Sequence, residues 1–365
     1  PGAGEVSVKL RAAPCTPADL RTLDAAAASA AATAATATAT ADTTITTTTT
    51  TFPFVGGSEG LWEVTAAGEG VSGLRPGDLA IPTATGNPPG CLAAPETGTW
   101  RTTATLGETS LVRVPPGGGR GTDAAVVAHC SGSVATALRV LEDFVEGGLR
   151  AGDRVVFTGA SSAVAQASCF CFHILLQLAA SRGLESVCLV NSEEEAALAM
   201  RLGAWKATLL KEFKAMRMDN ARLVADGEGG VLGFTAARAL GFRGSFVSYA
   251  DASGGGVSLP VAGQIFSDSR CRGFSLSRWA AGRPVEETRG LTVRALEAAA
   301  AGLKLEGARE FELSEAVAGI GAARRRRGPA PFSRSEKLVG GGGGGYSLSC
   351  MAGRRPIDPR IPTMP

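Results

Sequence analysis

The sequence predicts an α/β fold that combines a β-rich, barrel-like domain with a doubly wound parallel sheet. Between residues 52 and 81, short apolar runs are separated by Gly and Gly-Asp turns, which is typical of β structure. From Arg154 onward, buried-strand patterns alternate with helical patterns, which indicates a parallel sheet covered by helices. The length of 365 residues agrees with two domains.

The elements of the first half are mostly strands. Strands are expected over residues 6–10, 79–81 and 100–114. Residues 25–51 are almost entirely Ala and Thr, which predicts a low-complexity insertion at the surface. A tight turn is expected at Arg75–Asp78, and residues 83–97 form a loop rich in Pro and Gly.

The second half alternates helices with strands. Helices are expected over residues 123–150, 164–181 and 193–202, because apolar residues recur there at helical spacing. Strands are expected over residues 154–157, 187–190, 207–210, 222–226 and 246–249. From residue 340 a glycine run leads into a tail rich in Pro and Arg, which predicts a flexible C-terminal extension over 340–365.

Composition excludes several functional classes. The net charge of +2 gives no support for nucleic-acid binding, and the longest apolar run is too short to cross a membrane. The eight cysteines are scattered without a Cys-x-x-Cys pair, and His129 and His173 have no neighbouring ligand residues. We therefore expect no metal site. The four arginines Arg324–Arg327 are interpreted as a solvated segment, or alternatively as a contact for RNA or an acidic partner.

A small-residue turn follows the strand that ends at Thr158. Gly159 is followed by Ser161, Ser162, Ala163 and Val164 before the expected helix. This is the place of the phosphate turn in a dinucleotide fold, where glycine lets the pyrophosphate approach the backbone N–H groups. Plain close packing of strand and helix explains the same pattern, so both interpretations stay open here.

Acidic residues follow the next strand. Asn191 and Ser192 precede the glutamates Glu193 to Glu195. An acid at this position suits the ribose hydroxyls of NAD, whereas the 2′-phosphate of NADP requires Arg or Lys. The alternative is that these acids begin a helix, where the helix dipole favours negative charge.

Five segments resemble the mitochondrial trans-2-enoyl-thioester reductases, which are zinc-free medium-chain dehydrogenase/reductases. They are Val55–Gly60, Gly73–Asp78, Gly98–Thr102, Leu138–Phe144 and Arg272–Trp279. The resemblance implies a GroES-like domain over residues 1–133 and 282–339 with a Rossmann-like domain over 134–281. It also implies a mitochondrial location and reduction of enoyl-CoA or enoyl-acyl-carrier-protein by NADPH, assisted by a tyrosine. Zinc is not implied, because Ser58-Glu59 stands where zinc-dependent relatives have His-Glu.

The positions that match the family's functional residues are altered. Ala27 lies near the place of the tyrosine, and the acid Glu193 replaces a base near Asn191. If a cofactor is retained, the resemblance assigns it to Ser133, Ser161, Ser162, Ala163, Val164, Asn191, Glu193, Tyr249, Phe274, Ser275, Leu276 and Lys337. Scaffold motifs are therefore kept while cofactor and catalytic motifs are changed.

Three functions agree with this pattern. The first is a catalytically inactive subunit, without a cofactor, of a larger mitochondrial assembly of protein subunits. The second is an active reductase that uses NADPH or, through Glu193, NADH. The third is a module that binds an acyl chain or acyl carrier protein without turnover, with Trp100 and Trp279 as candidate pocket residues.

Overall fold

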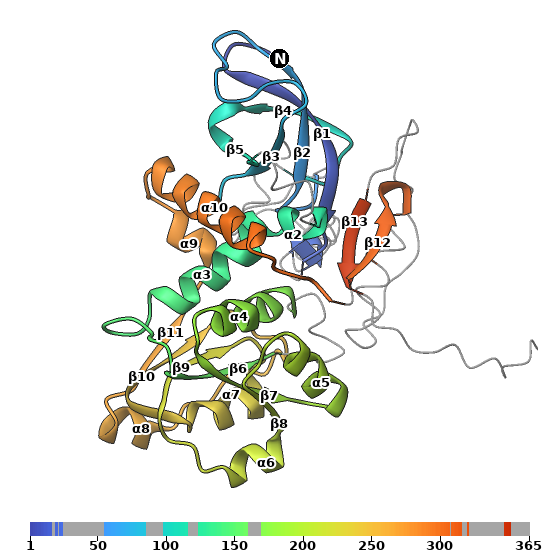
Figure 1. The fold of residues 1–365 in the computed structure, drawn as a ribbon. Helices are drawn as coiled ribbons and strands as arrows, with labels where there is room; N and C mark the ends of the chain where they lie inside the picture. Colours follow the sequence, from blue (N-terminus) through green and yellow to red (C-terminus); the bar gives the residue numbers. More distant parts are fainter. Residues whose placement is uncertain are drawn as a thin grey trace, which may run out of the picture.

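The protein contains two β-sheets joined by a layer of helices (Figure 1). The computed structural model describes residues 1–16, 19–20, 22–24, 55–84, 98–115, 123–159, 169–306, 308–315, 320 and 347–351. The first sheet is mixed and holds the N-terminal strands, whereas the second is parallel and lies at the opposite end of the molecule.

The first sheet follows the order β12-β13-β1-β2-β3-β5, with β4 paired to β1. Its strands are β1 (Glu5–Pro14), β2 (Leu61–Ala67), β3 (Leu79–Pro82), β4 (Thr103–Gly107), β5 (Leu111–Arg113), β12 (Ala308–Glu312) and β13 (Ser347–Met351). Side chains of β1 alternate between buried and partly exposed from Glu5 to Leu10, as one buried face of a sheet requires. Single turns of 3-10 helix, η1 (Glu108–Ser110) and η3 (Leu313–Glu315), follow β4 and β12.

The C-terminal segment contributes a strand to this sheet. β13 runs parallel to β1, with Ala12 opposite Ser347, and antiparallel to β12, with Glu312 opposite Ser347. Residues 347–351, which lie in the segment predicted to be a flexible extension, are therefore part of the sheet.

The helices between the sheets differ from the single helix expected over residues 123–150. The structure has α2 (Ala124–Ala128), a π-helix η2 (Cys130–Val134) and α3 (Ala135–Glu142), followed by turns. Val134 N donates to His129 O at 3.0 Å, which is the wider spacing of a π-helix. α3 ends at Glu142, with Asp143 as its C-cap, and the turns that follow contain Gly147 and Gly148, both with positive φ angles. α9 (Leu276–Ala280) and α10 (Val285–Ala300) complete this layer (Figure 1).

The second sheet is parallel throughout, in the order β11-β10-β9-β6-β7-β8. Its strands are β6 (Arg154–Thr158), β7 (Glu185–Val190), β8 (Lys206–Leu209), β9 (Ala221–Asp226), β10 (Leu240–Ser248) and β11 (Arg270–Gly273). The central strands are almost continuously buried because helices cover both faces. This arrangement confirms the predicted doubly wound sheet.

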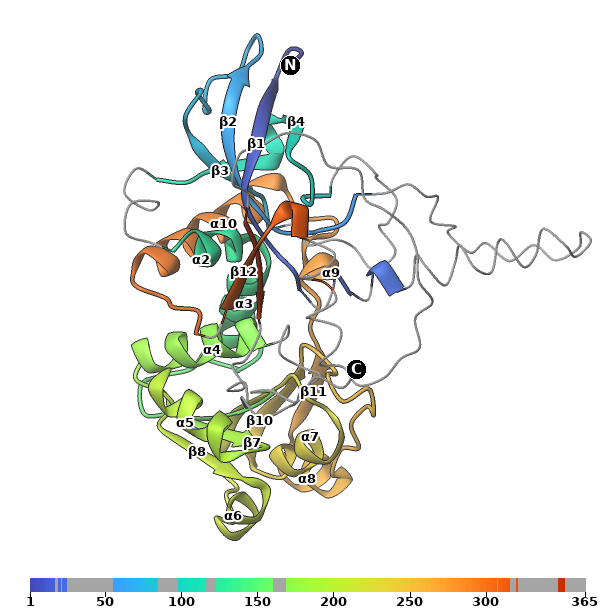
Figure 2. The same ribbon diagram turned by 90° about the vertical axis from the view of Figure 1, so that its right-hand side faces the viewer.

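Helices cover the two faces of the parallel sheet separately (Figure 2). Buried residues of α3, α4 (Cys169–Ser181) and α5 (Glu193–Arg201) pack with one face, and those of α6 (Leu210–Ala215) and α7 (Gly230–Ala237) pack with the other. α8 (Val261–Phe266) precedes the edge strand β11. The predicted helix over 164–181 is present from Cys169, and residues 160–168 lie outside the described part.

The strand order reverses between β6 and β9, because β7 and β8 lie on one side of β6 and β9 to β11 on the other. Such a reversal is the usual place for a ligand in an open α/β sheet. None of the helices among the described residues is long and apolar enough to cross a membrane. The proposed domain boundaries at residues 133/134 and 281/282 stay a prediction.

Candidate functional site

The Gly-Gly-Ser-Glu-Gly segment interlocks with the Gly-Thr-Trp segment below the first sheet. A Cβ atom on Gly57 would lie 2.3 Å from Thr99 Oγ1, and one on Gly98 would lie 1.9 Å from Val55 O. Thr99 Oγ1 donates to Glu59 O at 2.7 Å, and Trp100 Nε1 donates to Pro14 O at 3.1 Å. Side chains larger than hydrogen are thus excluded at both glycines, and the two motifs form one packed unit.

Glu59 connects this unit to the π-helix. Its Oε2 accepts hydrogen bonds from Gly132 N at 3.0 Å and Ser133 N at 3.2 Å, and its Oε1 accepts one from Ser133 Oγ at 3.2 Å. The carboxyl group thus engages N–H groups in η2 at the point where the expected α-helix is interrupted. The side chain of Glu59 is only 7% exposed, and burial raises its pKa to about 8.

Ser133, a predicted cofactor residue, lies inside this connection. Its hydroxyl is 3.1 Å from His129 Nδ1 and also bonds Glu59. Burial lowers the pKa of His129 to about 3, so its imidazole is neutral and packs on the ring of Phe170. Nearby, Asp19 accepts from Thr16 N at 2.8 Å and Thr16 Oγ1 at 2.7 Å, and its charge raises the pKa of Glu59 further.

A second polar cluster lies at the carboxyl edge of the parallel sheet, where the strand order reverses. Thr158, the last residue of β6, is opposite Asp226, the last residue of β9, and their side chains are hydrogen-bonded. Tyr249 lies one residue beyond β10, and its hydroxyl donates to Thr158 O at 3.4 Å. Thr158 and Asp226 were not predicted as site residues. The signal available in the sequence was a polar residue at the end of each of these two apolar runs.

Asn191 and Glu193 are both exposed at the same edge, after β7. Asn191 N donates to Glu195 Oε2 at 2.8 Å, and Glu195 N donates to Ser192 Oγ at 3.3 Å. Ser192 therefore caps α5, with acids in the first turn. This geometry bears out the helix-start interpretation of the acidic run, and it occupies the backbone N–H of Asn191.

Phe274, Ser275 and Leu276 lie between β11 and α9. Phe274 contacts the ring of Phe144 edge-on at 5.7 Å, Ser275 caps α9 by accepting from Arg278 N, and Leu276 is buried. The guanidinium groups of Arg139 and Arg283 both contact the ring of Trp279, at 4.7 and 4.6 Å from its centre. These residues pack at the junction between the parallel sheet and the helix α9.

The remaining predicted residues lie outside the described ranges. They are Ala27, Ser161, Ser162, Ala163, Val164, Arg324–Arg327 and Lys337. Within the described ranges, no group of three or more His, Cys, Asp or Glu side chains could hold a metal ion.

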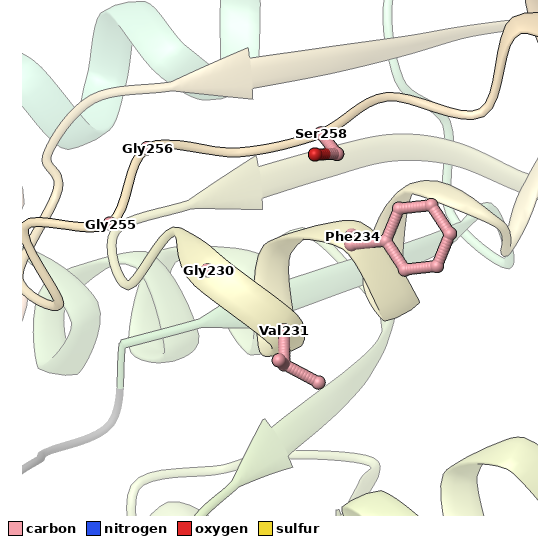
Figure 3. Close-up of a pocket in the computed structure, with 6 residues that line it drawn as sticks. All are labelled: Gly230, Val231, Phe234, Gly255, Gly256 and Ser258. Carbon is pink, nitrogen blue, oxygen red and sulfur yellow. The ribbon is translucent and has the colours of Figure 1, made fainter.

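Sequence reasoning missed a pocket beside α7. It has a volume of about 400 Å³ and lies between α7 and the segment that follows β10. Figure 3 shows Gly230, Val231 and Phe234 on the helix and Gly255, Gly256 and Ser258 on the facing segment. The signal available in the sequence was the pair Gly229-Gly230, and in the structure both glycines have the positive φ angles that glycine readily adopts.

The GroES-like domain of alcohol dehydrogenases matches residues 2–116. Mitochondrial enoyl-[acyl-carrier-protein] reductase of Xenopus tropicalis is 30% identical over 292 residues, covering 76% of this chain and 71% of that protein. The Bos taurus protein of the same name is 29% identical over 76% of this chain and 66% of its own length. This chain thus spans about two thirds of the length of such relatives.

Solved structures agree on the fold. The mitochondrial 2-enoyl thioester reductase heterodimer of Candida tropicalis has a TM-score of 0.61 at 18% identity, covering 96% of this chain and 92% of that chain. A complex of Etr1p with NADP and crotonyl-CoA has a TM-score of 0.62 at 20% identity, covering 84% and 82%. Taken with the sequence identities, the fold and the shared motifs show that this chain belongs to the mitochondrial enoyl-[acyl-carrier-protein] reductase family of medium-chain dehydrogenase/reductases.

Proposed function

We propose that this chain is an enoyl-thioester-reductase-like protein that no longer reduces enoyl thioesters and instead acts as a subunit of a larger mitochondrial assembly. The observation that carries the proposal is the carboxyl edge of the parallel sheet. Acids gather there, with Glu193 to Glu195 after β7 and Asp226 at the end of β9. A dinucleotide brings two or three phosphate charges to such an edge, where negatively charged side chains repel them.

The absence of the family tyrosine supports the same proposal. The sequence has two tyrosines, Tyr249 and Tyr346. The hydroxyl of Tyr249 packs against Gly227 and donates to Thr158 O, so it is engaged in joining two strand ends. A positioned general acid contributes roughly 10²- to 10⁴-fold in rate. An enzyme without one would retain little activity even if it bound both substrates.

A role as a subunit is supported by apolar side chains on one edge of the parallel sheet. Phe266 is 82% exposed and Phe242 70% exposed, and Val261 and Ile265 on α8 are also exposed. They lie near β11, the last strand of the sheet. Exposed apolar patches and open strand edges are typical of protein contacts. The partners we propose are other protein subunits, and the mitochondrial location follows the names of the relatives.

The test is isothermal titration of the chain with NADPH and then NADH, followed by reduction of crotonyl-CoA with either cofactor. We expect no binding of NADPH at micromolar concentrations and no turnover. Binding with turnover would contradict the proposal.

Light scattering of the purified chain, and of a Phe266→Ser variant, measures association through the exposed edge. Ser181→Ala is a surface control that leaves this edge unchanged.

The alternative is an active reductase, and the bound NADP of the structural relative favours it. In that case Glu193 would bind the ribose of NADH, or Lys211, which follows β8 at the same edge, would supply the cation for a 2′-phosphate. Glu193→Gln would then weaken NADH binding and Lys211→Ala would weaken NADPH binding.

The other alternative, binding of an acyl chain or acyl carrier protein without turnover, is tested by titrating crotonyl-CoA alone.

A further inference from the structure

The helix α8 carries apolar side chains that are exposed to solvent. All six of its residues are at least partly exposed, and Val261, Ile265 and Phe266 are 63%, 66% and 82% exposed. Burial of such side chains is the main favourable contribution when protein surfaces associate. Three of them on a helix of six residues therefore indicate a surface that another molecule covers.

The pocket beside α7 is joined to α8 by a short segment. Ser258 lines the pocket, and α8 begins three residues later at Val261. On the opposite wall, Val231 and Phe234 lie one helical turn apart on α7 (Figure 3). Phe266 is the last residue of α8, about 9 Å further along the helix. Neighbouring parts of one surface thus hold an apolar hollow and an apolar projection.

The segments that form this surface carry no charged side chain. Residues 252–267, which run from the pocket through α8, include no Asp, Glu, Lys or Arg, and neither does α7. Where a chain meets its own copy across a two-fold axis, residues at the axis face their own type, so charges there repel. The uncharged stretch suits a second copy of this chain. It offers nothing to the phosphates of nucleic acid or of an anionic membrane, which bind through Lys and Arg.

Two ion pairs lie beside this surface. Arg243 Nε is 3.2 Å from Asp268 Oδ2, two residues after α8, and Arg270 Nη2 is 3.0 Å from Glu146 Oε2. Both pairs are exposed and already neutralised within the chain. They are suited to the polar rim that surrounds the apolar centre of a protein interface.

We propose that two copies of this chain associate through this surface, with Phe266 of each copy in the pocket beside α7 of the other. Val261 and Ile265 then cover the centre of the contact. The contact is reciprocal, because a two-fold axis brings the same two parts together twice. Each pocket is completed by a residue of the partner copy. The inference rests on the proposed function, whose exposed edge it uses, and it names a second copy as the partner there.

Sedimentation equilibrium of the full chain, from micromolar to hundred-micromolar concentration, measures the dimerisation constant. Phe266→Ser removes the projection, and Ser258→Trp fills the pocket from its own wall. The matched control is Val293→Ser, because Val293 is an exposed apolar residue of α10, in the helical layer between the sheets. Circular dichroism verifies that each variant is folded. If Ser258→Trp does not fold, Phe266→Ser decides alone, since its side chain is exposed.

We expect the natural chain to form a dimer and no larger species. Phe266→Ser and Ser258→Trp should each weaken dimerisation about thirtyfold or more, as loss of a central aromatic anchor does. Val293→Ser should associate as the natural chain does. A monomeric natural chain, growth beyond a dimer, or a Phe266→Ser variant that dimerises normally would each overturn the inference.

Mixed crosslinking tests which parts meet. Copies that carry Phe266→Cys are mixed with copies that carry Val231→Cys and are oxidised with diamide, and the natural chain gives the background of its own cysteines. We expect crosslinked dimers from the mixture and only background from either variant alone. Faster crosslinking of Phe266→Cys with itself would place Phe266 at the two-fold axis and overturn the pocket assignment.

The failure of this inference and the failure of the proposed function give different results. A dimer that binds NADPH and reduces crotonyl-CoA would overturn the proposed loss of activity and leave the contact standing. A monomer without turnover would overturn the contact and leave the loss of activity standing.

Discussion

The unit around Glu59 and the cluster around Asp226 each bury a carboxyl group where two segments meet, but the two carboxyl groups differ in their hydrogen bonds. Glu59 has donors at both oxygens, from Gly132 and Ser133, whereas Asp226 has donors at one oxygen only within the part of the chain that the structure describes. A buried polar group without a partner costs more than a satisfied one contributes. Glu59 therefore links the Gly-Gly-Ser-Glu-Gly segment to η2, while Asp226 at the end of β9 keeps one carboxylate oxygen without a hydrogen-bond partner among the described residues.

The largest expected effect concerns the charge state of Glu59. Its folded pKa of about 8 lies above the unfolded value, so the stability it contributes is full below pH 4.5 and declines as pH rises to about 8. Relative to Glu59→Gln, the natural chain should lose up to roughly 1.4 kcal/mol per pH unit over that range. Urea unfolding from pH 5 to pH 8.5 measures this. A constant difference between the two chains would contradict it.

Gly132 is the next position to change. A Cβ atom there would lie 2.4 Å from the carboxyl carbon of Glu59, so Gly132→Ala must displace the carboxyl group and its hydrogen bonds. We expect a loss of about 3 kcal/mol in the free energy of unfolding. The matched control is Gly290→Ala in α10, where a Cβ atom meets no atom within 4 Å. The control should gain roughly 0.5–1 kcal/mol from helix propensity, and equal effects of both changes would refute the Glu59 connection.

Asp226→Asn tests the other half of the comparison. Burial raises the pKa of Asp226, so its ionised form destabilises the fold as pH rises above the unfolded value. The variant keeps an acceptor for Thr158 and removes the charge, and we expect a gain of about 2 kcal/mol in unfolding free energy at pH 8. Thermal and urea unfolding at pH 5 and pH 8 give the result. A loss of stability at pH 8 would show that the charge is needed.

Ser192→Ala carries the smallest effect. Ser192 Oγ accepts from Glu195 N at the start of α5, and loss of such a cap costs about 1 kcal/mol. Glu193→Gln removes one acid from the same turn and is the control, because the side chain of Glu194 is itself hydrogen-bonded to Ser192. Denaturant unfolding of both should separate the cap from the acidic charge. If Ser192→Ala has no effect while Glu193→Gln does, the acids matter through charge alone.

Prediction from sequence succeeded where the pattern is local. Buried strands such as Arg154–Thr158 and Glu185–Val190 are apolar runs flanked by turns, and their alternation with helices predicts the parallel sheet. The break of the helix near Gly132 could not be predicted, because the carboxylate that binds its N–H groups belongs to Glu59, more than seventy residues away in the sequence. The pairing of β13 with β1 is likewise invisible in a segment that follows a glycine run.

The fold class, the family motifs and the substitutions at Asn191, Glu193 and Ala27 can be recognised in the sequence, because they depend on residue identity and short spacing. The hydrogen bonds of Ser133 with Glu59, of Asn191 N with Glu195 and of Thr158 with Asp226 are visible only in the folded protein. Whether a carboxyl group is satisfied, and thus what charge it carries, depends on donors and burial supplied by distant segments.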